Sequence, residues 1–292
     1  ANYVLSVAVT PDGKQIISAN DYNTIRVARL SDGQYLRARL GHTDDVMSVV
    51  VTPDGAKIVS GSKDGTVKVW ETQGVGVSGS VLTSLWMAEN SPYRVNGEIN
   101  VQVASTLTIE PGVDVLFDAD VQFIVQGSLH AVGTEIDSIR FLKGLAANWR
   151  GLRIVGGSDN AIAYARISGG NADGTEPEWL GGGLFVAEGA TVELNNSVIS
   201  ANTAIAGGGL FNYGTAYVAN CIFSGNSSTG AWSMGGGVQN EGTMTVTDCA
   251  IFGNSAPTDS YGGGVGNTGT VDLSGCVIYG NDAGYGGGGV NN

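Results

Sequence analysis

The sequence predicts an all-β protein built largely from stacked repeat units, and three observations lead to that prediction. A glycine triplet followed by short β-branched runs recurs at spacings of 26, 28 and 27 residues, and a cut-off copy starts about 25 residues after the last full one. Near the N-terminus, VLSVAVTPDGKQIIS from Val4 returns as VMSVVVTPDGAKIVS from Val46, a shift of 42 residues. Between these regions apolar residues alternate along short runs, and helical periodicity of any length is missing. Repeats of this length stack on their neighbours instead of folding into one closed globule.

The composition and charge of the chain exclude several classes of binding partner. With 292 residues the chain is long enough for one large or two modest domains, and its net charge of −13 disfavours nucleic acid and anionic membrane surfaces as partners. Arg166 is the last basic residue, so the region after it cannot by itself assemble a phosphate site or a lyase site that needs Lys or Arg. No apolar run approaches the roughly 18 residues of a transmembrane helix, and no signal-peptide pattern opens the chain. Because both ends fall inside repeats, we expect a segment of a longer, secreted protein.

Residues 1–75 are expected to form short strands joined by Pro-Asp-Gly and Asp-Gly turns. Their period of 42 residues is accompanied by Gly41-His42 and by the run SGSKDGTVKVWE from Ser60, in which a tryptophan follows an Asp-Gly turn. This combination resembles the WD40 repeat of β-propellers, over fewer than two blades. The N-terminal region is therefore expected to be a partial, β-propeller-like segment.

The resemblance implies a buried, hydrogen-bonded tetrad that holds one blade. Its members would be His42, Ser60, Asp64 and Trp70. His42 would then be a structural residue rather than a metal ligand or a catalytic base. In the first copy Ala28 replaces the tryptophan, so no tetrad is expected there.

The middle of the chain predicts a second domain. Residues 76–92 are interpreted as a linker, because the stretch begins with an uncharged run rich in Gly, Ser and Val, and short strands follow over residues 93–180. Three runs in this stretch, Thr106–Val113, Gly127–Thr134 and Trp149–Leu152, resemble successive entry coils of right-handed parallel β-helix proteins. The resemblance implies that residues 93–180 form the entry coils of such a β-helix.

Carboxylates cluster in this middle region. Besides Asp114, the sequence has Asp118 and Asp120, which the alternation places on one strand face. Paired acids of this kind perform general acid–base chemistry in hydrolases with a β-helix fold. The alternative, which we favour, is a solvated strand edge that blocks unwanted pairing. His130 and Asp137 offer no stronger arrangement, so no catalytic residue is predicted.

The repeats over residues 181–292 each contain the glycine triplet with a short strand, a turn, an alternating strand and an [FI]-x-x-N turn. The full copies begin at Gly181, Gly207, Gly235 and Gly262. An asparagine therefore recurs at one corner of each unit, where stacked amides can form a ladder that satisfies the backbone groups of the turn. These asparagines are Asn202, Asn226, Asn254 and Asn281.

The cysteines also hold one position in successive repeats. Cys221, Cys249 and Cys276 are spaced by 28 and 27 residues, and Ser197 occupies the same place in the first copy. Neighbouring rungs lie about 4.8 Å apart, which makes a disulfide between them conceivable. We favour an inward ladder of small, buried side chains. Because Cys-x-x-Cys pairs are lacking, no zinc site is predicted.

The GG-apolar motif and the F-x-x-N turn together resemble the repeats of polymorphic outer-membrane proteins. The first motif occurs in every full copy, whereas the second is strict only at Phe223 and has Ile in the Phe place elsewhere. The resemblance implies a right-handed parallel β-helix, about eight coils long with its entry coils included. It also implies a bacterial protein, secreted or exposed at the cell surface and linked with adhesion.

We therefore expect an extracellular or cell-surface structural or adhesive protein without enzymatic activity. Glycans and a host or neighbouring cell surface are the expected partners, and neither nucleic acid nor a transmembrane segment is expected. Because the coil ends carry no cap, a homo-oligomer or a head-to-tail filament is expected as well. The alternative function is a carbohydrate-active enzyme, a polysaccharide lyase or hydrolase, on a pectin-lyase-like β-helix.

Ligand contacts are expected in the loops before each glycine triplet, because insertions on one edge of a solenoid mark its exposed face. The aromatic candidates there are Trp232, Tyr261 and Tyr285. The alternative, which we favour, is that these rings shield the corner of the coil. No cofactor or metal is predicted, since the glycine- and aspartate-rich pattern of RTX calcium sites is absent.

Overall fold

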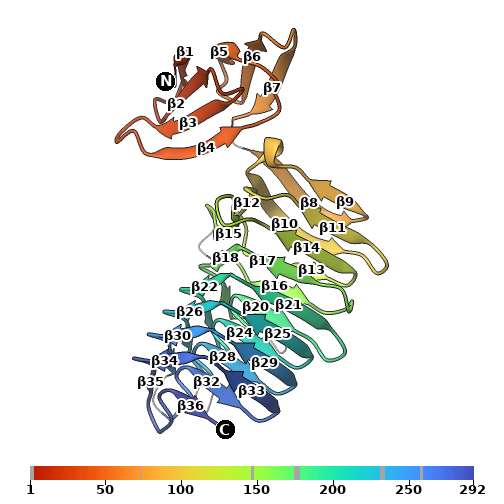
Figure 1. The fold of residues 1–292 in the computed structure, drawn as a ribbon, viewed down its shortest axis with the longest axis vertical. Coiled ribbons are helices and arrows are strands. Elements are labelled where there is room, and N and C mark those ends of the chain that lie inside the picture. Colours follow the sequence, from red (N-terminus) through yellow and green to blue (C-terminus); the bar gives the residue numbers. More distant parts are fainter. Residues whose placement is uncertain (1–2, 73, 146–147, 174–177, 231–233, 257–258) are drawn as a thin grey trace. The chain divides into compact units, whose positions relative to one another are not determined.

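The structure, a computed structural model, describes residues 3–72, 74–145, 148–173, 178–230, 234–256 and 259–292. Within these ranges the chain forms strands β1 to β36 and one short 3-10 turn, η1 (Ala88–Asn90), so the predicted all-β class is confirmed (Figure 1). The chain divides into two compact units. Unit 1 comprises Ala1–Val75 and Met87–Tyr93, and unit 2 comprises Gly76–Trp86 and Arg94–Asn292.

Unit 1 contains two antiparallel sheets that are related by the 42-residue repeat. The first sheet has the order β1-β2-β3-β4, and the second has the order β5-β6-β7. Their strands are β1 (Val4–Val9), β2 (Gln15–Asn20), β3 (Ile25–Arg29), β4 (Tyr35–Arg39), β5 (Val46–Val51), β6 (Lys57–Ser62) and β7 (Val67–Glu71).

A Thr-Pro-Asp-Gly turn joins the first two strands of each sheet. In the first sheet the Thr10 hydroxyl donates a hydrogen bond to Asp12 Oδ1 (2.6 Å), and the Lys14 amide donates to the same oxygen (3.0 Å). Thr52 and Asp54 form the equivalent bond at 2.5 Å. The threonine hydroxyl is the largest cause that lowers the pKa of each aspartate. These short side-chain bonds to the local backbone hold the chain reversal.

The two sheets of unit 1 share one core of branched apolar side chains. Alternation along each strand sends every second residue into this core. The buried members are Ile17, Ala19, Ile25 and Val27 from the first sheet, and Val46, Val49, Ile58 and Trp70 from the second.

Unit 2 is made mainly of parallel strands, each paired with the equivalent strand of the next repeat, and they form four stacks. The first stack contains β13 (Phe123–Val125), β16 (Leu152–Ile154), β20 (Leu184–Val186), β24 (Leu210–Asn212), β28 (Val238–Asn240), β32 (Val265–Asn267) and β36 (Val290–Asn291). The second contains β9 (Ser84–Trp86), β11 (Thr106–Ile109), β14 (Ser128–Val132), β17 (Ala161–Ala163), β21 (Thr191–Asn195), β25 (Thr215–Ala219), β29 (Thr243–Thr247) and β33 (Thr270–Ser274).

The third stack contains β12 (Asp114–Phe117), β15 (Ile139–Lys143), β18 (Ala165–Ser168), β22 (Val198–Ser200), β26 (Ile222–Ser224), β30 (Ala250–Phe252) and β34 (Val277–Tyr279). The fourth contains the two-residue strands β19 (Asn171–Ala172), β23 (Thr203–Ala204), β27 (Ser227–Ser228), β31 (Ser255–Ala256) and β35 (Asp282–Ala283). Strand β10 (Tyr93–Val101) stands between β12 and β13 in sheet order and also pairs with β8 (Val75–Val81).

The chain visits these stacks in a fixed order. After β18 it passes through β19, β20 and β21 and reaches β22, which pairs with β18 in parallel. We call each such circuit a coil. In-register pairing places equivalent residues of successive coils on one another, as with the buried Val192, Ala216 and Met244. The intervening Glu193 and Tyr217 are exposed, so the second stack has one interior and one exterior face.

Crowding explains the glycine triplet. Gly207 has a φ of +64°, in the left-handed region that glycine adopts without steric cost. A Cβ on Gly208 would lie 2.4 Å from the carbonyl oxygen of Ser227, and one on Gly209 would lie 2.5 Å from that of Gly237 in the next coil. The triplet therefore marks a place where the chain reverses against its neighbour and leaves no room for side chains.

The loops before the first two glycine triplets end in packed residues. Leu180 forms a parallel bridge with Ala206, and both pack with Trp179 against Phe185 and Phe211. These two phenylalanines are 3% and 1% exposed. All three residues of β20 and of β24 are buried, because the ends of the loops add a layer outside the first stack. None of the described residues lies in a helix long and apolar enough to cross a membrane.

Candidate functional site

The four residues of the proposed tetrad lie together in unit 1. Trp70 Nε1 donates to Ser60 Oγ (2.9 Å), and His42 Nε2 lies 2.8 Å from the same oxygen. His42 Nδ1 lies 2.7 Å from Asp64 Oδ2. Because the Asp64 carboxylate can only accept, Nδ1 carries the proton that it donates to Asp64, and in the neutral ring Nε2 accepts from the Ser60 hydroxyl. Both ring nitrogens of a buried imidazole are therefore engaged, which suits a structural role.

The carboxylate of the tetrad is held ionised. The Thr66 hydroxyl and amide donate to Asp64 Oδ1 at 2.7 and 2.8 Å. The hydroxyl bond is the largest cause that lowers the pKa of Asp64, and the bond from His42 adds to it. In the first sheet, Ala28 stands at the tryptophan position and the hydroxyl of Ser18 donates instead to a backbone carbonyl (3.5 Å).

The acidic cluster of the middle region forms ion pairs with arginines. Asp118 and Asp120 do not share a strand face as predicted, since β12 ends at Phe117 and both follow it. Arg94 donates to both oxygens of Asp118 (2.8 and 2.6 Å), and Arg150 lies 3.2 and 3.3 Å from those of Asp120. Paired in this way, the carboxylates are neutralised individually rather than presented together.

Asp114 and His130 are likewise held by side-chain partners, whereas Asp137 is held in its loop through its backbone amide. Arg140 binds Asp114 in bidentate fashion at 2.5 and 2.8 Å. His130 Nε2 lies 3.1 Å from Asp159 in an exposed pair. The amide of Asp137 donates to the Thr134 hydroxyl within a loop (3.0 Å). Within the described ranges, no group of three or more His, Cys, Asp or Glu side chains is arranged to hold a metal ion.

The predicted corner asparagines stand in one column of unit 2, in which Asn202, Asn226 and Asn254 are buried and Asn281 is half-buried. Asn202 Nδ2 donates to Asn226 Oδ1 (3.0 Å), Asn226 Nδ2 to Asn254 Oδ1 (2.9 Å), and Asn254 Nδ2 to Asn281 Oδ1 (2.9 Å). Each carbonyl oxygen also accepts the backbone amide of the preceding asparagine, as Asn226 does from Asn202 (3.1 Å). The amide of Gly170 caps the column at Asn202 Oδ1 (2.9 Å). Interior amides are thus satisfied by repetition from coil to coil.

Unit 2 contains a second column of asparagines, which was not predicted from the sequence. Asn212 Nδ2 donates to Asn240 Oδ1 (2.8 Å), Asn240 to Asn267 (2.7 Å), and Asn267 to Asn292 (2.5 Å). The signal was present, because from Leu210 onward an asparagine ends each first-stack strand or follows it directly, in LFN, VQN, VGN and VNN. It recurs with the same period as the first column.

The cysteines form a third column, at the corner between the second and third stacks. All three are free thiols. The amide of Cys221 donates to Cys249 Sγ (3.3 Å), and the amide of Ala165 donates to Ser197 Oγ (3.0 Å) in the equivalent place. The hydrogen bond between the two thiols raises the pKa of Cys221 and lowers that of Cys249 to about 7, while burial raises the pKa of Cys276. The Cys221 and Cys276 thiols, whose pKa values are raised, are poor nucleophiles.

The same corner carries a row of residues in the left-handed region. Tyr164, Asn196, Asn220 and Asp248 have φ between 48° and 53°, and Gly275 has φ of 63°. Asn and Asp are among the residues that tolerate this conformation best, because their short polar side chains bond locally. From Asn196 onward the corner therefore carries small polar side chains or glycine, one above another on the exposed surface.

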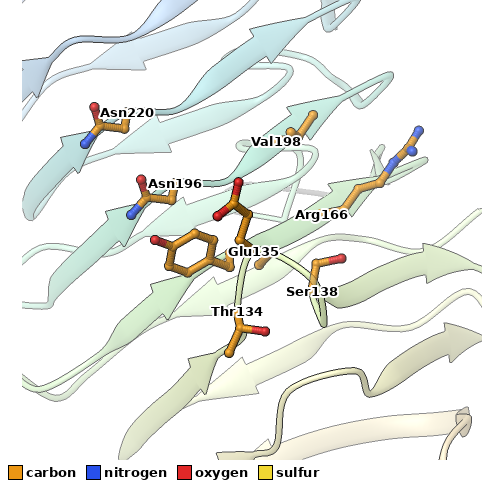
Figure 2. Close-up of a pocket in the computed structure, with 9 residues that line it drawn as sticks. Thr134, Glu135, Ser138, Arg166, Asn196, Val198 and Asn220 are labelled. Atoms are coloured by element: carbon orange, nitrogen blue, oxygen red, sulfur yellow. The ribbon is translucent and has the colours of Figure 1, made fainter.

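A groove of about 550 Å³ lies beside this row in unit 2 (Figure 2). Its volume is within the range of sites that bind small molecules. One wall is the loop between β14 and β15, and the other consists of the corner and the starts of β18 and β22. The groove is lined by Thr134, Glu135, Ser138, Tyr164, Ala165, Arg166, Asn196, Val198 and Asn220.

The lining offers several kinds of polar group. Figure 2 shows Glu135 on the loop, with Asn196 and Asn220 on successive coils beyond it. A carboxylate accepts hydrogen bonds, a guanidinium such as that of Arg166 donates them, and an amide does both. The ring of Tyr164 adds an aromatic surface with a polar end. This set matches a ligand rich in hydroxyl groups.

The groove was not predicted from the sequence, because its residues come from four separate segments. Only the asparagines that follow β21 and β25 gave a signal, through their recurrence at one repeat position. Of the aromatic residues predicted to contact ligands, Tyr261 and Tyr285 lie 5.5 Å apart between ring centroids, and Tyr285 is 64% exposed. Trp232 lies outside the described residues.

Comparisons with known proteins bear on unit 1. The family model described as WD domain, G-beta repeat matches residues 33–71, which include β4 to β7, so the predicted WD40 repeat is confirmed there. Two similar solved structures are described as "Structure of U3-55K" and "Crystal structure of RRP9 WD40 repeats". Each is 30% identical over 24% of this chain and 22% of its own, with a TM-score of 0.24. The chain thus spans less than a quarter of the length of these structures. No curated protein matches the chain.

Proposed function

We propose that unit 2 is a right-handed parallel β-helix of about eight coils, counted as β10 followed by the seven strands of the first stack, and of the polymorphic outer-membrane protein type. Parallel in-register pairs such as Leu210 with Val238 support the stacking of coils. The hand follows from the strong preference for right-handed connections between parallel strands. The glycine triplets and the asparagine column at the F-x-x-N corner support the family resemblance.

We further propose that the protein is a structural and adhesive component that acts outside the cell or at its surface, and that it binds glycans without transforming them. The groove beside the corner row carries this proposal. Its carboxylate, guanidinium, amide and phenol groups offer the mixed donors and acceptors that sugar hydroxyls need. The long columns of interior hydrogen bonds support a rigid element that holds such a groove in place.

The groove favours binding over hydrolysis. Glycosidases use two carboxyl groups, roughly 5 to 10 Å apart, that flank the bond to be cleaved. Among the lining residues that the structure describes, Glu135 alone carries a carboxylate. Asp114, Asp118 and Asp120 are each paired with an arginine.

Calorimetric titration with neutral hexasaccharides tests this proposal. Cellohexaose, mannohexaose and laminarihexaose are titrated into the full chain, with hexagalacturonate as the acidic comparison. We expect at least one neutral sugar to bind, and Glu135→Ala to weaken its binding about tenfold through the loss of hydrogen bonds from sugar hydroxyls. Glu188→Ala, which removes an exposed carboxylate from a turn outside the groove, should leave binding unchanged. Equal binding by both variants, or none by the parent chain, contradicts the proposal.

A polysaccharide lyase is the second candidate. Arg166 and Tyr164 line the same groove as Glu135, and a base beside a cation is what proton abstraction next to a uronate carboxylate requires. Prolonged incubation with polygalacturonate, followed by ultraviolet detection of unsaturated ends, separates the two candidates. Unsaturated products that Arg166→Gln abolishes would replace the adhesive proposal with the enzymatic one.

A further inference from the structure

The two sheets of unit 1 each have two apolar faces that correspond through the 42-residue repeat. Face A comprises Ala8, Ile17, Ile25 and Val27 in the first sheet, with Val50, Val59, Val67 and Val69 as counterparts in the second. Face B comprises Val4, Val7, Val9 and Ile16 in the first sheet, with Val46, Val49, Val51 and Ile58 as counterparts in the second. Strand pairing preserves the correspondence, because Ala8, Ile17 and Val27 align across the first sheet as Val50, Val59 and Val69 align across the second.

Within the chain, face A of the first sheet packs on face B of the second. Ile17, Ile25 and Val27 on one side and Val46 and Ile58 on the other all have no exposed surface. Trp70 joins them from the second sheet, at 6% exposure. The contact is therefore heterologous, with different surfaces of the repeat meeting each other.

The remaining two faces are exposed. On face A of the second sheet, Val50, Val67 and Val69 are 55%, 71% and 57% exposed. On face B of the first sheet, the corresponding values for Val4, Val7 and Val9 are 61%, 57% and 47%. Contiguous apolar surface of this kind on a sheet marks an interaction site rather than ordinary solvent-facing residues.

We infer that face A of the second sheet docks on face B of the first sheet in another copy of this chain. The two exposed faces are the counterparts of the two that already pack inside unit 1. Sheets of this repeat therefore already pack on each other through these faces within the chain, and a sheet from a second copy matches the exposed faces in shape and apolar pattern.

Repetition of this contact links chains head to tail through unit 1. Heterologous contacts close into a ring when the rotation between neighbours allows it. With two sheets per chain, about two to four copies would complete a ring of roughly four to eight blades. Ala28 of the first sheet stands where the second has Trp70, so the contact between chains is shallower than the one within the chain.

Light scattering coupled to gel filtration, over a dilution series of the full chain, measures the association. We expect a species of between two and four copies that dissociates on dilution. Val67→Asp on face A and Val7→Asp on face B should each weaken it about tenfold or more, since each places a carboxylate against an apolar surface. Val103→Asp changes a residue of unit 2 that is 72% exposed and should leave the association unchanged. Circular dichroism melts verify that all three variants fold.

Mixing the two face variants supplies a sharper measurement. Val67→Asp keeps an intact face B and Val7→Asp keeps an intact face A, so the mixture should form a dimer and stop there. A parent chain that remains monomeric at every concentration overturns the inference. So does a mixture that remains monomeric, because the intact face A of one variant and the intact face B of the other must pair if the inference holds, and so does unaltered association of either variant alone.

Discussion

Both units are built from sequence repeats, yet they satisfy their buried polar groups in opposite ways. Unit 1 builds one network, in which His42 is fixed by Ser60 and Asp64, and its first sheet packs without a copy of it. Unit 2 repeats one bond from coil to coil, as between Asn202 and Asn226. The cause lies in the pairing. In-register parallel stacking places identical side chains on one another about 4.8 Å apart, whereas the repeats of unit 1 meet through different faces.

This difference predicts how far the destabilising effect of a substitution extends through the protein. In a column, each amide both accepts from one neighbour and donates to the next, so the loss of an interior member disturbs the groups on both sides. In the tetrad, the partners are confined to one sheet. Substitutions in the columns should therefore have the largest effects, and substitutions in the tetrad should affect unit 1 alone.

Asn226→Ala should produce the largest loss of stability. It removes the acceptor for the amide and Nδ2 of Asn202, and the donor to Ile199 O and Asn254 Oδ1. Leaving several buried groups unpaired should cost about 4 kcal/mol in the free energy of unfolding of unit 2. Asn212→Ala is the matched control, because it ends its column and its Oδ1 has no hydrogen-bond partner among the described residues. Urea denaturation of unit 2 that shows equal losses for both variants would contradict the column as the source of stability.

Gly208→Ala should cost somewhat less. The added Cβ would meet the carbonyl oxygens of Ser227 and Gly236 at 2.4 and 2.6 Å, and overpacking of this kind costs about 3 kcal/mol. Gly61→Ala in unit 1 is the comparison, since a Cβ there meets nothing within 4 Å. Thermal melts should show a clear decrease in melting temperature for the first variant and almost none for the second. Similar melting temperatures would mean that the coil relaxes around position 208.

Repetition also decided what could be predicted from the sequence. The glycine triplets and the corner asparagines predicted stacked units, because identical residues at one period must occupy identical places. The column from Asn212 could have been predicted by the same argument. The arginine partners of Asp118 and Asp120 could not, since Arg94 and Arg150 are 24 and 30 residues away and carry no repeat signal.

Surfaces formed by segments that are far apart in the sequence could not be predicted either. Phe185 and Phe211 belong to three-residue strands whose pattern does not tell which segment covers their outer face. The groove depends on a loop between β14 and β15 that lies outside the regular repeats. In both cases the sequence does not show which non-repeating segment packs against the strands of the repeats.

Low pH should destabilise unit 1 by protonating its aspartates. Thr66→Val, which acts on one of them, should cost less stability than Asn226→Ala or Gly208→Ala costs unit 2. The folded-state pKa of Asp64 is below the ordinary value of 3.8, so the carboxylate stabilises unit 1 above that pH. That stability is lost as the pH falls from about 4 through the lower, folded-state pKa. Removing the Thr66 hydroxyl takes away the largest cause of the lowered pKa. The variant should therefore be less stable at neutral pH and show a flatter dependence on pH below 4.

Melting temperatures of the parent chain and the variant, measured from pH 7 to pH 2, test this expectation. Thr24→Val is the matched control, because Thr24 occupies the equivalent place in the first sheet, where its hydroxyl donates to Asn20 instead of a carboxylate (2.8 Å). It should lower stability without changing the dependence on pH. Two variants with the same acid response would show that the hydroxyl of Thr66 acts on unit 1 through packing rather than through the charge of Asp64.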